Sequence, residues 1–130
     1  MANLSDTTEF GLNIGINAGY FHANEEKDPV KIVTEKWHKL AEEIFKDCGI
    51  YIGAVICQSK TVYRPEWGCP PGGEDTLTIS GVRNPEFQTN DDLWKIAVSR
   101  VAIRLASELQ QSAAYLTFKK VELLYLKVSA

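Results

Sequence analysis

Residues 10–20 read FGLNIGINAGY, and this stretch decides the fold because its apolar side chains occupy every second position. Alternation with a period of two is the pattern of a β-strand, so one face of the strand carries Phe10, Leu12 and Ile14. The opposite face carries only glycine and asparagine. Such a bare face lets a helix, another backbone segment or a ligand approach closely, and we favour tight packing against another element.

The segment after this strand predicts an amphipathic helix over residues 28–49. Asp28 followed by Pro29 is typical of a helix start, because aspartate caps the first turn and proline fits its first position. Apolar residues then recur at three- and four-residue spacing, and Gly49 ends the helix. The apolar positions are Val30, Val33, Trp37, Leu40, Ile44 and Cys48.

Two strands and a second helix are expected further along the chain. Residues 50–57 are apolar on both faces, which predicts a buried central strand, with 61–63 as a possible extension. Residues 76–80 alternate as a half-exposed strand. Residues 91–111 form a helix that is apolar around most of its circumference and begins after Thr89 or Asn90.

The last part of the chain is strand-like over 114–118 and 121–128, as one strand with a bulge or as two strands. The order strand, helix, strand, strand, helix, strand predicts an α+β fold, a ferredoxin-like split βαβ sandwich with a mostly antiparallel sheet. A tautomerase-type double βαβ arrangement is the alternative. We expect a single domain over residues 1–130, with a flexible N-terminus over 1–8.

Composition excludes several classes of protein. The chain is 45% hydrophobic and 24% charged, which suffices for a core without a disulfide or a metal. A net charge of −3 and the lack of a basic run argue against nucleic-acid binding. The apolar runs are too short to cross a membrane and the N-terminal residues do not resemble a signal peptide. Three unpaired cysteines indicate a reducing compartment, so we expect a cytoplasmic protein.

The second informative stretch is the loop over residues 64–75, RPEWGCPPGGED. Proline and glycine exclude a helix here, and loops of this length in compact domains are usually either functional or disordered. The predicted topology places this loop on one rim of the sheet, beside residues 21–28 and 110–113. We therefore predict a binding site at this rim.

The expected ligand-binding residues are the charged and aromatic side chains of this loop, with His22 opposite: Arg64, Glu66, Trp67, Glu74 and Asp75. Trp67 either stacks on a ligand or plugs the loop onto the body of the protein. The loop acids could also form an acid–base pair.

Nucleophilic or metal chemistry finds weaker support. Cys69 with His22 as its base is a candidate catalytic pair, but the surrounding acids would raise the pKa of the thiol, which favours a structural cysteine. The spacing of Cys48, Cys57 and Cys69 fits no metal site, and no nucleotide or cofactor motif is present, so we expect neither metal nor cofactor.

The sequence thus predicts a homo-oligomer, assembled through its second helix, that binds a small molecule or a protein partner at the rim without covalent chemistry. The alternative is a small enzyme performing acid–base chemistry at a subunit boundary, an isomerase of tautomerase-like topology. Such an enzyme would use His22 or the loop carboxylates for proton transfer, because the N-terminal proline base of tautomerases is absent and Ala2 follows Met1. A third possibility is an assembly component that docks through the loop.

Overall fold

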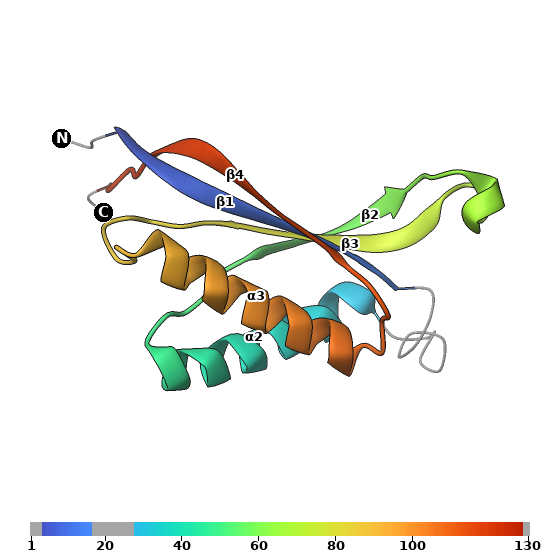
Figure 1. The fold of residues 1–130 in the computed structure, drawn as a ribbon, viewed down its shortest axis with the longest axis horizontal. Coiled ribbons are helices and arrows are strands. Elements are labelled where there is room, and N and C mark those ends of the chain that lie inside the picture. The colour runs from blue at the N-terminus through green and yellow to red at the C-terminus, as the bar shows by residue number, and fades with distance from the viewer. Residues whose placement is uncertain (1–3, 17–27, 129–130) are drawn as a thin grey trace.

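The computed structural model describes residues 4–16 and 28–128, which form a sheet covered on one face by two helices (Figure 1). The elements are β1 (Leu4–Gly15), α2 (Pro29–Cys48), β2 (Val55–Thr61), the short 3-10 helix η1 (Pro65–Trp67), β3 (Glu74–Val82), α3 (Asp91–Glu108) and β4 (Tyr115–Leu124). The four strands lie in the order β2-β3-β1-β4 and all neighbouring pairs are antiparallel. This order of elements and strands confirms the ferredoxin-like α+β fold.

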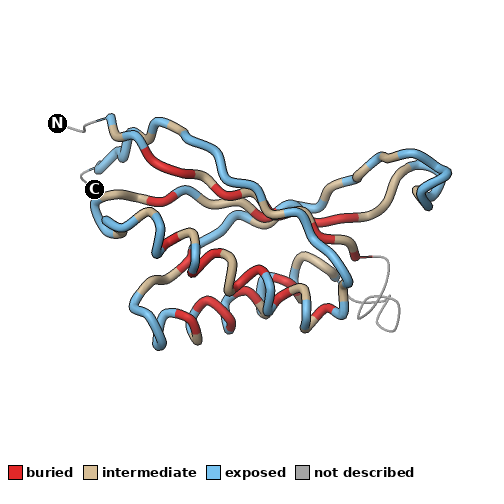
Figure 2. The backbone as a smooth tube through the Cα atoms, in the orientation of Figure 1, coloured by how far each residue is buried: buried red, intermediate tan, exposed pale blue. Residues whose placement is uncertain are grey.

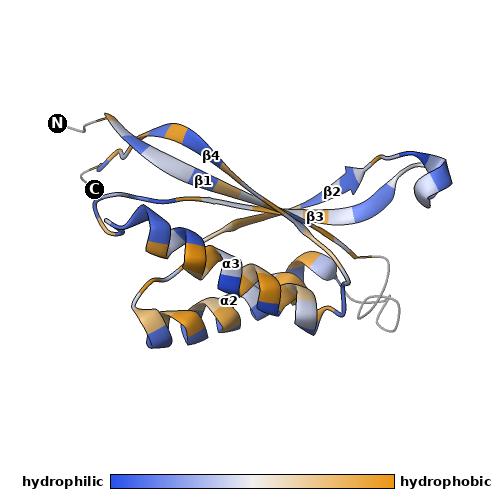
Figure 3. Cartoon of the chain, viewed as in Figure 1, coloured by the Kyte–Doolittle hydropathy of each residue, from blue (hydrophilic) through white to orange (hydrophobic). Residues whose placement is uncertain are grey.

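The core lies between the apolar face of the sheet and the helices, where the buried segments of both layers face each other (Figure 2). The apolar residues of β1 point into it, and Leu12 is paired with Ile79 on one side and Leu116 on the other. The rings of Trp37 and Trp94 lie 5.8 and 5.9 Å from that of Phe10. The apolar sides of both helices turn toward the sheet (Figure 3). Each helix therefore contributes one tryptophan to the centre of the core.

Both helices begin at side-chain caps. The Asp28 carboxylate accepts hydrogen bonds from the backbone N–H groups of Val30 and Lys31, and Gly49 ends α2 with φ of 79°. Asn90 caps α3 by accepting from the N–H of Leu93, so it and not Thr89 is the cap. The helix predicted over 28–49 is confirmed.

Two local predictions are wrong. Residues 4–8 belong to β1, because pairing with β4 extends through them to Leu124, so the flexible segment predicted for 1–8 does not include them. The apolar run 50–57 is not a central strand. Ile50 to Ile52 pack beneath α2, where Trp37 Nε1 donates to the carbonyl of Ile52 at 2.9 Å, and the edge strand β2 starts only at Val55. The glycine face of β1 lies on the side of the sheet away from the helices, and its closest described neighbours come from the adjacent strands, Thr117 at Gly11 and Glu74 at Gly15.

The open question at the end of the chain is resolved, since Tyr115–Leu124 forms a single strand. None of the helices in the described parts of the chain is long and apolar enough to span a membrane.

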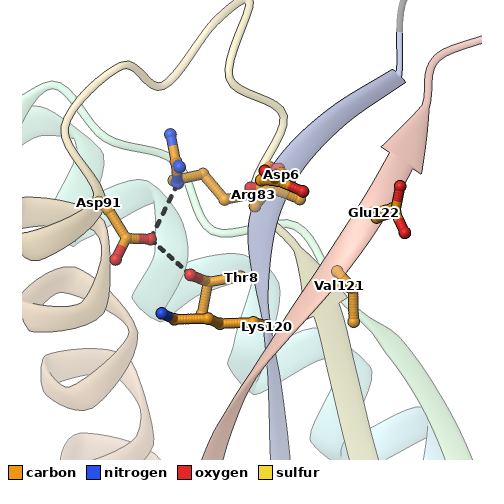
Figure 4. A pocket seen from close by; sticks show the side chains of 8 residues that line it. Asp6, Thr8, Arg83, Asp91, Lys120, Val121 and Glu122 are labelled. Atoms are coloured by element: carbon orange, nitrogen blue, oxygen red, sulfur yellow. Dashed lines mark hydrogen bonds and ion pairs between the residues drawn. The ribbon is translucent and has the colours of Figure 1, made fainter.

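A polar cluster, which we call the anchor cluster, fixes the start of α3 to the sheet (Figure 4). The Asp91 carboxylate accepts from Thr8 Oγ1 at 2.7 Å and from Arg83 Nε at 3.0 Å. Arg83 is buried, and its Nη1 also donates to the carbonyl of Gln88 at 2.6 Å. The hydrogen bond from Thr8, helped by Lys95 and Arg83, lowers the pKa of Asp91 despite its partial burial. These polar groups satisfy one another, so we assign the cluster a structural role.

Candidate functional site

A cavity of about 470 Å³ lies on the sheet face that the helices leave open. It is bounded by the β2–β3 hairpin, the end of β1 and the start of β4. Three cross-strand pairs build it, because Gly15 lies opposite Thr76, Thr61 opposite Glu74 and Asn13 opposite Tyr115. The described residues that line it are Asn13, Gly15, Thr61, Tyr63, Trp67, Glu74, Thr76, Ala113, Ala114 and Tyr115. We call it the open-face cavity.

A tyrosine–glutamate pair provides the charge of this cavity. Tyr63 donates its phenol hydrogen to Glu74 Oε1 at 2.7 Å. This hydrogen bond raises the pKa of Tyr63 to about 12, because the carboxylate stabilises the neutral phenol. Tyr63 therefore remains a hydrogen-bond donor at neutral pH and does not act as a base. Glu74 is the only charged side chain among the described residues that line the cavity.

Gly15 makes room for the Glu74 carboxylate. A Cβ atom at this position would lie 2.5 Å from Glu74 Oε2 and 3.3 Å from Gln111 Oε1. The first of these distances is too short for any real contact, so the carboxylate occupies space that a side chain on β1 would otherwise fill. The close approach that the sequence predicts for the glycine face of β1 is therefore present at Gly15, where a carboxylate from the neighbouring strand packs against the backbone.

A chain of neutral polar groups lies beside the pair. The hydroxyl of Thr76 is 2.8 Å from that of Ser59 and 3.0 Å from that of Thr61. The Thr61 hydroxyl in turn donates to Asn13 Oδ1 at 3.4 Å. Thr76, Thr61 and Asn13 line the cavity with donors and acceptors but add no charge.

Trp67 reaches the cavity from the loop. It ends η1, where its backbone N–H donates to the carbonyl of Arg64 at 2.9 Å. Its side chain is 73% exposed although it lines the cavity. Trp67 therefore does not plug the loop onto the body of the protein.

The structure brings together only part of the predicted ligand-binding set. Trp67 and Glu74 meet at the cavity, close to Ala113, as the predicted rim requires. Arg64 and Glu66 instead pair with each other at 2.8 Å on the exposed loop. Asp75 forms an ion pair with Lys60 at 2.6 Å and does not line the cavity. His22 lies outside the described residues.

Cys69 stabilises the conformation of the loop. Its sulfur accepts a hydrogen bond from the backbone N–H of Tyr63 at 3.5 Å and lies 3.5 Å from the carbonyl oxygen of Pro70. These contacts support the structural cysteine that the sequence favours. Within residues 4–16 and 28–128, no group of three or more His, Cys, Asp or Glu side chains could hold a metal.

Sequence reasoning missed Tyr63, Gly15, Asn13 and Thr61 as site residues. The bare face of residues 11–19 was the available signal for two of them, because it indicated that something approaches the strand closely. Tyr63 gave no such signal, since its role depends on a hydrogen bond across the hairpin to Glu74.

Comparison with known proteins gives both structural likenesses and a family. A phage SAM lyase in the apo state is similar over 95% of this chain and 94% of its own, with 12% identity and a TM-score of 0.49. A phage SAM lyase in complex with S-methyl-5'-thioadenosine is similar over 92% and 90%, with 11% identity and a TM-score of 0.46. A de novo designed protein with a ferredoxin fold is similar over 96% and 88%, with 16% identity and a TM-score of 0.39.

No curated protein matches the sequence. The family model described as SAM lyase matches residues 5–127, and by this match along almost its whole length the chain belongs to the SAM lyase family.

Proposed function

We propose that the protein cleaves S-adenosylmethionine in the open-face cavity. The observation that carries this proposal is the Glu74 carboxylate, held by Tyr63 as the only charge among the described lining residues. S-adenosylmethionine carries two cationic groups, a sulfonium and an ammonium. An anionic, partly aromatic cavity complements such a substrate. Membership of the SAM lyase family supports the same substrate.

A lyase breaks a bond without adding water, and the substrate itself contains the nucleophile that this needs. The carboxylate of its methionine part can reach the carbon two bonds beyond the α-carbon and close a five-membered lactone. The new carbon–oxygen bond forms as the carbon–sulfur bond breaks, and the electron pair of that bond goes to sulfur. The products are S-methyl-5'-thioadenosine and the lactone of homoserine. No proton is transferred, so the step requires no general base, in agreement with the high pKa of Tyr63.

The contribution of the protein would then be orientation and exclusion of water. Positive sulfonium and negative carboxylate neutralise each other in this step, and loss of charge is favoured where water is scarce. The protein would hold the substrate in the folded conformation that brings its carboxylate to the carbon. In well-oriented intramolecular reactions this effect lowers the activation barrier by roughly 7–11 kcal/mol. In this proposal Glu74 attracts the cation, and Tyr63 holds Glu74 in place.

The test is cleavage of S-adenosylmethionine, followed by chromatographic detection of S-methyl-5'-thioadenosine. Glu74→Gln keeps the size of the side chain and removes its charge. We expect kcat/KM to fall roughly ten- to a hundredfold, since a hydrogen bond or ion pair to a charged group contributes about 1.5–3 kcal/mol. Glu66→Gln is the matched control, because Glu66 lies on the same loop and does not line the cavity. Lack of cleavage by the wild-type protein, or equal activity of the two variants, would contradict the proposal.

We also infer that chains associate through α3, as the sequence predicts. Leu93, Ile96 and Ile103 are 51%, 56% and 69% exposed, and their spacing places them along one side of the helix. Exposed apolar stripes of this kind are typical of protein interfaces. The occupant would be a second copy of the chain.

A further inference from the structure

Trp67 differs from the other two tryptophans in its surroundings. Trp37 and Trp94 are 4% and 3% exposed and lie in the core, whereas Trp67 is 73% exposed and borders the open-face cavity. An indole ring is large and apolar, so leaving it in water forgoes about 2–3 kcal/mol of burial energy. An exposed tryptophan at the mouth of a cavity is thus available to cover a flat, apolar part of a ligand.

The loop holds Trp67 in position through its own backbone. The N–H groups of Trp67 and Gly68 donate to the carbonyls of Arg64 and Pro65, both at 2.9 Å. Gly68 adopts φ of 102°, a conformation that other residues rarely take. The hairpin closes below with Gly73 N–H donating to Pro70 at 3.0 Å. These turns fix the backbone that carries the indole before any ligand arrives, which reduces the backbone entropy lost on binding.

Either the sulfonium or the adenine ring of the substrate could contact the indole of Trp67, and the expected interaction energies favour the adenine ring. A cation over an exposed aromatic ring contributes about 0.5–1 kcal/mol. A base stacked on an aromatic side chain contributes about 1–3 kcal/mol. Glu74, on the strand that floors the cavity, already complements the cationic part, whereas Trp67 lies on the loop beyond it.

We infer that Trp67 is the stacking platform for the adenine ring of the substrate, and that it determines specificity for adenosylated sulfonium compounds over smaller ones. This inference rests on the proposed function, because it takes the adenosyl group from that substrate.

The first test is binding of S-methyl-5'-thioadenosine, which contains adenine but no sulfonium. Fluorescence is excited at the red edge of indole absorption, where adenine does not absorb. Trp67 is the exposed tryptophan and therefore emits at the longest wavelength, so stacking of adenine on it is expected to quench that part of the emission. The variant Trp67→Phe is expected to bind the compound without this quenching. Quenching that persists in Trp67→Phe would overturn the inference.

The second test separates adenine from sulfonium. Trp67→Leu is expected to weaken the binding of S-methyl-5'-thioadenosine and to raise KM for S-adenosylmethionine, each about five- to a hundredfold. Binding of S-methylmethionine, a sulfonium without adenine, is expected to stay unchanged. Trp67→Phe is expected to restore most of the affinity. Phe87→Leu is the control, since Phe87 is 66% exposed and lies outside the cavity lining.

The outcomes distinguish the two proposals. If the wild type cleaves S-adenosylmethionine and Trp67→Leu changes neither its KM nor the affinity for S-methyl-5'-thioadenosine, the stacking role is wrong and the lyase function stands. If S-methyl-5'-thioadenosine binds through Trp67 but the wild type cleaves no S-adenosylmethionine, the platform stands and the lyase function is wrong. If no adenosyl compound binds, both are wrong.

Discussion

Replacing Gly15 by alanine places a methyl group against the Glu74 carboxylate without touching the core. The new Cβ would lie 2.5 Å from Glu74 Oε2, whereas ordinary van der Waals contact begins at 3.4 Å. The carboxylate must therefore withdraw by about 1 Å. It cannot slide toward Gln111, because Gln111 Oε1 is already 3.3 Å from the same Cβ position.

The displacement breaks the tyrosine–glutamate pair. The hydrogen bond from Tyr63 is 2.7 Å long, and about 1 Å of added length takes it beyond the range of an O–H···O bond. Hydrogen bonds to charged groups contribute about 1.5–3 kcal/mol, so we expect kcat/KM for S-adenosylmethionine to fall roughly ten- to a hundredfold. Global stability should change little, because the group that yields is the end of a partly exposed side chain.

Two measurements check this expectation. The first is the release of S-methyl-5'-thioadenosine from S-adenosylmethionine. The second is the ionisation of tyrosine, followed by ultraviolet absorbance or by NMR of labelled tyrosine. In the wild type Tyr63 titrates at about 12, and in Gly15→Ala its pKa should return toward the ordinary 10.0. One more phenol should then ionise between these two pH values than in the wild type.

Gly11→Ala is the matched control, because Gly11 lies on the same face of the same strand. Its Cβ would meet only Thr117 Oγ1, at 3.1 Å, and that hydroxyl can rotate away. Wild-type kcat/KM and an unchanged Tyr63 titration in Gly15→Ala would refute a role of the tyrosine–glutamate pair in activity. An equal loss of activity in Gly11→Ala would refute the specific role of Gly15.

Two further predictions concern stability and assembly. The lowered pKa of Asp91 means that its charge stabilises the fold above its unfolded value of 3.8, and that this contribution is lost as pH falls through the lower folded value. Thr8→Val removes the main cause, so its free energy of unfolding, measured with urea, should depend less on pH in this acid range than that of the wild type; equal pH dependence would contradict the role of Thr8. Ile103→Lys should reduce the oligomer size measured by light scattering, whereas Val62→Lys, on an equally exposed apolar residue, should not. Equal sizes for Ile103→Lys and the wild type would exclude α3 as the interface.

The fold could be predicted from the sequence because its signals are local. Asp28-Pro29 and Gly49 mark the two ends of α2, and the alternation after Phe10 fixes which face of β1 enters the core. The run 50–57 was predicted wrongly for a physical reason. Ile50 to Ile52 are apolar because they pack beneath α2 without pairing to a strand, and only residues 55–57 pair with β3, at the edge of the sheet. Periodicity reports burial, and burial occurs in connections as well as in strands.

The site could be predicted only as a place. Proline and glycine marked the loop as irregular, and the predicted topology placed it beside residues 110–113, of which Ala113 lines the same cavity as Trp67 and Glu74. The sequence does not predict which charged residues pair with each other. Arg64 and Asp75 form ion pairs within the hairpin, and these pairs neutralise their charge. Which acid stays available depends on contacts across strands, and Glu74 is distinguished only by Tyr63 and by the vacant side-chain position at Gly15.

The hairpin that carries Tyr63, Trp67 and Glu74 projects past the helical layer, away from both chain ends (Figure 1). Its functional side chains therefore lie within one short span of sequence and contribute no residue to the buried core. Such an arrangement separates the requirements of folding from those of chemistry. Under the proposed function, substitutions in the hairpin are expected to alter the preferred substrate with little loss of stability, and transfer of residues 62–75 between relatives should exchange their specificities.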